Sequence, residues 1–327
     1  MQDSSNNYSS DVNQLNSLVE KTQLLKKEIG KIIIGQEDII DQVLISIFSK
    51  GHCLLVGVPG LAKTLLVNTI SSALGLSYNR IQFTPDLMPS DIVGSEVLDE
   101  NRRFKFIKGP IFANIILADE INRTPPKTQA ALLEAMQEHS VTVSGNTNIL
   151  EEPFFVLATQ NPIEQEGTYP LPEAQLDRFM FMLWLDYPSF EEEINILKAT
   201  TTGMNTKVEK ILSKEEIILM QDLIRKIPVP DNVYEYAVRL VEKTRVSTPN
   251  AHPIANKYLS WGAGPRASQY LIIGAKCHAV LKGKYSPDIE DIKAVAVSVL
   301  RHRIVQNYSS QAEGYTAEKI IIDLINS

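Results

Sequence analysis

Apolar residues recur along the chain with two different spacings, which divide it into helix-like and strand-like stretches. Residues 12–19 and 36–48 repeat apolar positions every three or four residues, so both stretches predict helices. Residues 1–11 are instead rich in Ser and Asn. They offer too little apolar surface to offset the entropy lost on ordering, so we expect a flexible tail there.

Strand and helix patterns alternate between residues 50 and 185. Short apolar runs predict buried strands over residues 52–56, 79–83, 115–118, 154–158 and 180–185. Helical spacing predicts helices over residues 63–74 and 125–138. Residues 141–150 predict a hairpin with Ser144-Gly145-Asn146 at its tip. The alternation is typical of an α/β fold, in which a parallel sheet carries helices on both faces.

The pattern changes at residues 186–188, beyond which only helical spacing is found. The predicted helices there cover residues 189–200, 213–225, 232–245, 266–281 and 289–301. We therefore expect an αβα core over residues 12–187, followed by an all-helical domain over residues 188–327. Phe181 and Trp184, in the last predicted strand, are expected to lie in the core.

Composition narrows the classes of protein that the chain could be. Its 327 residues, 44% of them hydrophobic, can form about two domains with real cores. The net charge of −7 disfavours nucleic acid and anionic membranes as partners. The longest apolar run, residues 179–185, is much shorter than the ~18 residues of a membrane span, so no membrane insertion is expected. The start of the chain lacks the apolar region of a secretory signal, and Cys53 and Cys277 fit a reducing compartment, so we expect a cytoplasmic protein.

A phosphate-binding motif lies between a predicted strand and a predicted helix. Glycines let the backbone wrap closely around phosphates, and the amide N–H groups at the helix start attract the β-phosphate. Lys63 would add a cation to the β- and γ-phosphates, and the Thr64 hydroxyl would bind Mg²⁺. The alternative is a turn followed by a helix with a surface lysine. The candidate nucleotide-binding residues of this segment are Gly57, Val58, Pro59, Gly60, Leu61, Ala62, Lys63, Thr64 and Leu65.

Ala62 departs from the motif, which has a glycine at this position. An alanine is tolerated if its backbone already has right-handed dihedral angles, because a β-carbon costs nothing there. We therefore expect a right-handed conformation at Ala62.

Two acids and an amide follow two of the predicted strands. Asp119 and Glu120 come directly after residues 115–118, and we expect them at the carboxyl edge of the sheet, one strand from the phosphate loop. Asp119 suits an Mg²⁺ shell, and Glu120 suits the orientation or deprotonation of an attacking water. Asn161 could hydrogen-bond the γ-phosphate and that water. The alternatives are a solvated turn for the acids and an Asn-Pro turn for Asn161.

The order of these motifs resembles that of AAA+ ATPases, and within them that of the MoxR family. Residues 167–179, which end in Leu-Asp-Arg-Phe, are the most specific of the stretches that carry the resemblance. The resemblance runs from about residue 29 to the C-terminus. It implies a P-loop NTPase core with a helical lid, ATP with Mg²⁺, and a homo-oligomeric ring that is usually a hexamer. The other supporting stretches are residues 34–36, 57–64, 117–123, 158–162 and 264–267.

The resemblance also assigns roles by position. It places Gly35 and Gln36 near the adenine, and it makes Asp119 and Glu120 the Walker B pair. Asn161 resembles sensor 1, Arg178 resembles the arginine finger and Arg266 resembles sensor 2. Residues 94–108 and 141–150 correspond to the two inserts of the family.

An arginine finger stabilises charge on the phosphoryl group, and a finger supplied by a neighbouring subunit couples hydrolysis to assembly. Arg123, which follows the Walker B acids, is an alternative to Arg178 in this role. Arg178 could also be a structural residue that pairs with Asp177 or Glu173. For Arg266, which opens a predicted helix, we expect movement toward the nucleotide when the domains close; the alternative is an ordinary helix-start residue.

The function implied by the resemblance is an ATP-driven machine that remodels a partner protein, often one with a von Willebrand factor A domain. A DNA-acting ring motor, another P-loop NTPase or kinase, and a nucleotide-binding scaffold without turnover are the alternatives. The predicted hairpin over residues 141–150 has no Lys or Arg, which disfavours DNA. Residues 256–259 lack the aspartate of the guanine-binding motif, and the presence of Glu120 disfavours an inactive scaffold.

Overall fold

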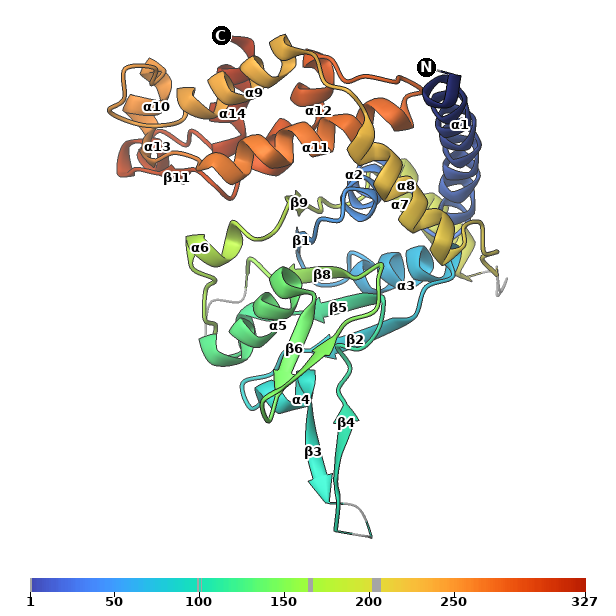
Figure 1. Ribbon diagram of the computed structural model, residues 1–327. Coiled ribbons are helices and arrows are strands. Elements are labelled where there is room, and N and C mark those ends of the chain that lie inside the picture. Colours follow the sequence, from blue (N-terminus) through green and yellow to red (C-terminus); the bar gives the residue numbers. More distant parts are fainter. Residues whose placement is uncertain (1, 99, 101, 164–166, 202–206) are drawn as a thin grey trace.

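The computed structural model describes residues 2–98, 100, 102–163, 167–201 and 207–327 (Figure 1). At its centre is a parallel five-stranded sheet with the strand order β2-β5-β8-β1-β9. This confirms the predicted α/β core. The sheet consists of β1 (Cys53–Val56), β2 (Tyr78–Gln82), β5 (Ile115–Asp119), β8 (Phe155–Gln160) and β9 (Phe181–Trp184).

Alternate residues of the central strands face two separate helical layers. On β1, Cys53 and Leu55 pack in one apolar cluster, whereas Leu54 and Val56 pack in the other. Side chains alternate between the two faces of a strand, and here both faces of the sheet are covered. Every residue of β1 is therefore buried, and its sequence is continuously apolar. The first cluster is covered by α1 (Gln2–Gly30), α2 (Glu37–Phe48) and α3 (Lys63–Leu74), and the second by α5 (Pro126–Glu138).

Two hairpins extend the core. The pair β6 (Ser140–Val143) and β7 (Asn146–Ile149) confirms the predicted hairpin. The pair β3 (Gly94–Leu98) and β4 (Phe104–Lys108) follows the short helix α4 (Pro89–Val93) and projects away from the sheet (Figure 1). It coincides with the insert that the family resemblance implied.

A largely helical domain follows β9 and packs above the sheet (Figure 1). Its long helix α11 (Pro265–Leu281) contacts α2 of the core, and α12 (Ile289–Leu300) contacts β9. The expectation of an all-helical domain is wrong in one detail, because β10 (Leu259–Trp261) and β11 (Val305–Gln306) form a two-stranded sheet that is too short to leave an alternating pattern. The helices are α7 (Phe190–Thr201), α8 (Lys214–Lys226), α9 (Asp231–Lys243), α10 (Pro253–Tyr258), α11 (Pro265–Leu281), α12 (Ile289–Leu300), α13 (Tyr308–Ala312) and α14 (Ala317–Asn326).

The start of the chain differs from the expected tail, because α1 begins at Gln2. Its later turns are anchored by buried Leu15, Leu18, Leu25 and Ile29. Once such a nucleus exists, each further residue adds a hydrogen bond at little cost, so the helix extends through polar sequence. The boundary between core and helical domain at residues 187 and 188 stays a prediction. None of the helices in the described part of the chain is long and apolar enough to cross a membrane.

Candidate functional site

The loop between β1 and α3 is shaped by two glycines. Gly57 donates its N–H to the Gln160 carbonyl (3.2 Å), and an added β-carbon would lie 2.9 Å from Cβ of Leu185. Gly60 has φ of +89°, in the region that side chains disfavour. Each glycine is therefore required for a different reason, one for close packing and the other for backbone conformation.

Ala62 has φ 55° and ψ 23°, so the expected right-handed conformation is wrong. A left-handed residue directly before a helix turns the preceding N–H groups of the loop toward one point, which creates an anion-binding concavity. Glycine adopts this conformation freely, whereas an L-residue with a β-carbon pays for it in steric energy. The backbone at Ala62 thus has the conformation of such a concavity despite the alanine, at some cost in stability.

Replacing Ala62 with Gly is expected to stabilise the nucleotide-free chain by about 1 kcal/mol. The Ala62 side chain is exposed, so the change relieves the left-handed strain without loss of packing. Thermal denaturation should show a rise in Tm of roughly 2 °C. Ala130, exposed within helix α5, is the matched control, because Ala130→Gly should lower Tm. A lower Tm for both variants would contradict the account of Ala62.

Lys63 begins α3, and its amino group donates to the Gly57 carbonyl (2.5 Å). Half-burial lowers the pKa of Lys63, and the nearby carboxylates of Asp119 and Glu120 oppose this shift. The lysine is therefore close enough to both acids for their negative charges to stabilise its protonated form. Thr64 and Leu65 follow in the first turn of the helix, and both are exposed.

The acids lie at the same edge of the sheet as the loop, but two strands away from β1 instead of one. The intervening strand is β8, whose Thr159 joins the two acids. The Thr159 hydroxyl donates to Asp119 Oδ1 (2.6 Å) and accepts the Glu120 N–H (2.9 Å). Glu120 has φ of 58°, a strained conformation of the kind that concentrates at functional sites.

Strand β2 supplies two further partners, which the sequence analysis missed. Arg80 donates to Asp119 Oδ2 through Nε (3.1 Å) and Nη2 (2.6 Å). Gln82 donates to Glu120 Oε2 (2.8 Å), which also receives Arg123 Nη1 at 3.0 Å. The only signal in the sequence was the alternation of polar residues along a half-exposed strand, and that pattern is equally typical of a solvated face.

Asn161 comes directly after β8 and is 5% exposed. The backbone carbonyl of the preceding residue, Gln160, accepts a hydrogen bond from the Gly57 N–H, so the structure brings Asn161 next to the loop between β1 and α3. Its Oδ1 accepts the Ile163 N–H (3.1 Å), the contact expected of an Asn-Pro turn. Both interpretations of this residue are therefore compatible with its position.

Arg178 and Arg266 line one small cavity of about 190 Å³, together with Lys50, His139 and Tyr270. Arg178 follows the short helix α6 (Glu173–Leu176) and donates to the Leu133 carbonyl (2.9 Å). Arg266, in the first turn of α11, donates to Asp177 Oδ2 (2.8 Å). The structure thus brings the two arginines to the same place, at the α6 side of the molecule.

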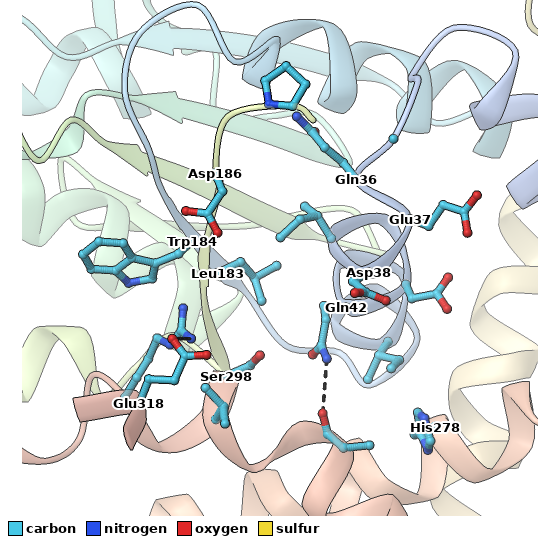
Figure 2. A pocket seen from close by; sticks show the side chains of 18 of the residues that line it. Gln36, Glu37, Asp38, Gln42, Leu183, Trp184, Asp186, His278, Ser298 and Glu318 are labelled. Atoms are coloured by element: carbon cyan, nitrogen blue, oxygen red, sulfur yellow. Dashed lines mark hydrogen bonds and ion pairs between the residues drawn. The ribbon is translucent and has the colours of Figure 1, made fainter. Parts of the chain in front are cut away.

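Gly35 and Gln36 lie at a larger pocket of about 830 Å³, between α2, the end of β9 and α12 (Figure 2). Gly35 has φ of +72°, in the region that favours glycine, and lies beside the Glu192 carboxylate. Asp186 lines the same pocket, and its neighbour Leu185 packs on Gly57, so the end of β9 connects this pocket to the phosphate loop. A base attached to phosphates in the loop could therefore reach Gln36.

Trp184 corrects an expectation, because it is 51% exposed and lines this pocket, whereas Phe181 is fully buried as expected. The tryptophan ends an edge strand, and its side chain alternates away from the apolar cluster that holds Phe181 and Leu183.

Comparisons with known proteins place this site in context. A family model described as "ATPase family associated with various cellular activities (AAA)" matches residues 52–181, and an AAA lid domain model matches residues 251–324. The chain is 43% identical over 296 residues to the chaperone MoxR1 of Mycobacterium tuberculosis, covering 90% of this chain and 78% of MoxR1. It is 42% identical over 303 residues to the uncharacterized protein YeaC of Bacillus subtilis, covering 92% of each chain. The crystal structure of a provisionally assigned ATPase from Cytophaga hutchinsonii superposes with a TM-score of 0.91 at 42% identity, over 98% of each chain.

Proposed function

Because this chain belongs to the MoxR family of AAA+ ATPases, we propose that it hydrolyses ATP with Mg²⁺ as a ring of identical subunits and uses the energy to remodel a partner protein. ATPase activity follows from the family itself, and a chaperone-like role agrees with the similarity to MoxR1. The observation that carries the proposal is that Lys63 and the acids Asp119 and Glu120 lie at the same edge of the parallel sheet, close enough for their charges to interact.

The oxygen atoms at this edge fit Mg²⁺. Among the residues that the structure describes, no group of three or more His, Cys, Asp or Glu side chains could hold a metal alone. Mg²⁺ bound with nucleotides typically uses only one or two protein oxygens and completes its shell with phosphates and water. Thr64 and Asp119 would supply those oxygens, and the ion would neutralise charge on the phosphates. Arg80 would then have to share Asp119 with the ion.

Within one subunit, each remaining residue has a task that its position supports. Lys63 and the loop amides hold the β- and γ-phosphates, and Gly35 and Gln36 border the adenine. Glu120 accepts a proton from the attacking water or orients it. Asn161, at the end of β8, hydrogen-bonds the γ-phosphate or the same water.

Arg178 and Arg266 suit the nucleotide of a neighbouring subunit. They share a cavity at the α6 side, whereas Lys63, Asp119 and Glu120 gather at the strand ends. Arg123, the rival for the trans role, instead contacts Glu120 of its own subunit. We therefore assign the arginine finger to Arg178, and we place Arg266 beside it instead of at its own subunit's phosphates.

The partner is proposed to be a protein, such as one with a von Willebrand factor A domain, and not DNA. The projecting hairpin β3–β4 exposes large apolar side chains, with Leu98 61% and Phe104 73% exposed. Exposed apolar groups of this kind mark protein-binding surfaces. The hairpin β6–β7 carries no Lys or Arg with which to follow a phosphate backbone.

The rate of ATP hydrolysis per subunit is expected to rise roughly tenfold or more with protein concentration, since an isolated subunit lacks a neighbour's arginine. Steady-state phosphate release, measured beside light scattering, should show this rise over the range in which the mass increases. Arg178→Ala is the control, and its rate should stay low throughout. A constant rate per subunit during assembly would contradict the trans arrangement, and stimulation by DNA would support the DNA-motor alternative.

A further inference from the structure

One side chain of the helical domain holds the segment that carries Arg178. Arg303 lies beyond α12, and its side chain is 1% exposed. Its Nε donates to Asp177 Oδ1 (2.8 Å), and its Nη2 donates to the carbonyl oxygens of Asp177 (2.9 Å) and Phe179 (2.6 Å). Its Nη1 donates to the Met180 carbonyl (3.2 Å). The guanidinium therefore binds the chain on both sides of Arg178.

Tyr270 of α11 completes this clamp. Its hydroxyl donates to the carbonyl of Arg178 itself (3.3 Å), and its ring lies 5.0 Å from the Arg303 guanidinium carbon. Each backbone carbonyl from Asp177 to Met180 thus accepts a hydrogen bond from the helical domain. Backbone held in this way has little freedom to move independently of that domain.

Arg303 also shares an acceptor with Arg266, the second arginine of the cavity. Arg303 binds Oδ1 of Asp177, while Arg266 binds Oδ2 of the same carboxylate. Arg303 therefore fixes the orientation of the group that holds Arg266. A planar guanidinium with five N–H donors suits this set of acceptors, whereas a lysine offers three donors from a single atom.

We propose that Arg303 is a positioning residue, which sets the place of Arg178 and Arg266 and so couples the position of the helical domain to the arginines offered to the neighbouring subunit. This inference rests on the proposed trans role of Arg178. Arg303 does not itself touch nucleotide. Its effect is exerted through the backbone of residues 177–180 and the Asp177 carboxylate.

The test is Arg303→Lys, which keeps the charge but loses the multiple contacts. Displacement of a catalytic group by about 1 Å can cost around 10²-fold, so we expect kcat to fall about 10²-fold. KM and equilibrium ATP affinity should stay within about twofold, since the phosphate loop is untouched. Arg239→Lys is the matched control: Arg239 lies on the exposed face of α9 and pairs with Glu235 (3.1 Å), so its kcat should stay near that of the wild type.

Mixing subunits separates positioning from general damage. Arg303→Lys subunits keep an intact phosphate loop, so mixing them with Lys63→Ala subunits, which keep intact arginines, should restore turnover. Mixing them with Arg178→Ala subunits should not. Restoration by Arg178→Ala, or an equal loss of kcat in Arg239→Lys, would overturn the inference.

A second variant tests the positioning role if Arg303→Lys fails to fold. Tyr270→Phe removes only the hydroxyl that binds the Arg178 carbonyl, and one such hydrogen bond predicts a fall in kcat of roughly fivefold with the same mixing behaviour. Wild-type kcat in Tyr270→Phe would then overturn the inference. If Arg178→Ala itself keeps wild-type turnover, the proposed trans role of Arg178 fails; if only the Arg303 and Tyr270 variants do, the failure is confined to the positioning role.

Discussion

The Glu120→Gln chain is expected to hydrolyse ATP roughly 10²–10⁴-fold more slowly than the wild type, the range typical of a lost general base. Glutamine has nearly the same shape, so contacts with Gln82 and Arg123 can persist. Its amide, however, cannot take a proton from water. The phosphate loop, Lys63 and Asp119 are unchanged, so ATP should still bind.

Phosphate release under saturating ATP measures this effect. Glu134→Gln, an exposed glutamate on α5, is a matched control that should hydrolyse ATP at the wild-type rate. Unchanged turnover in Glu120→Gln would remove Glu120 from its proposed role.

The Arg178→Ala chain is expected to lose about 10³-fold or more of its turnover, the contribution typical of an arginine finger. The loss should be recoverable, because Arg178→Ala subunits have a complete phosphate loop. Lys63→Ala subunits keep the arginine but are expected to bind nucleotide poorly. A mixture contains interfaces that join an intact loop to an intact arginine, so it should regain a measurable part of the wild-type rate.

Arg123→Ala distinguishes the two candidate fingers. Because Arg123 contacts Glu120 of its own subunit, Arg123→Ala mixed with Lys63→Ala should gain nothing. Recovery in that mixture, together with no recovery for Arg178→Ala in an assembled ring, would transfer the trans role to Arg123.

Much of the core could be predicted from the sequence, since its strands are buried on both faces and leave continuous apolar runs. The loop around Lys63 and the acids after β5 also follow from local pattern. The order of the strands does not, because burial says nothing about which strand is the neighbour. For that reason no pattern in the sequence indicates that β8, with Thr159, separates β1 from β5.

The errors share a physical cause, in that each concerns a residue whose state is set by distant parts of the chain. Ala62 is left-handed, a conformation typical of loops whose N–H groups form an anion-binding concavity rather than of its own side chain. Trp184 is exposed because β9 is an edge strand, a fact that depends on the pairing of the whole sheet. The role expected of Arg266 stays a prediction, but its contact with Asp177 likewise depends on how α11 lies across the segment after α6, which no spacing in the sequence reveals.

The proposed function requires that the loop from Gly57 to Thr64 bind the phosphates of ATP beside Asp119 and Glu120. Equilibrium titration of ATP with Mg²⁺ into the Glu120→Gln chain, which turns over slowly, tests it most directly. We expect saturable binding of ATP. Lys63→Ala in the same background should weaken it roughly 10–100-fold, which corresponds to the free energy contributed by one hydrogen bond to a charged group. Absence of ATP binding, or binding that is indifferent to the loss of Lys63, would contradict it.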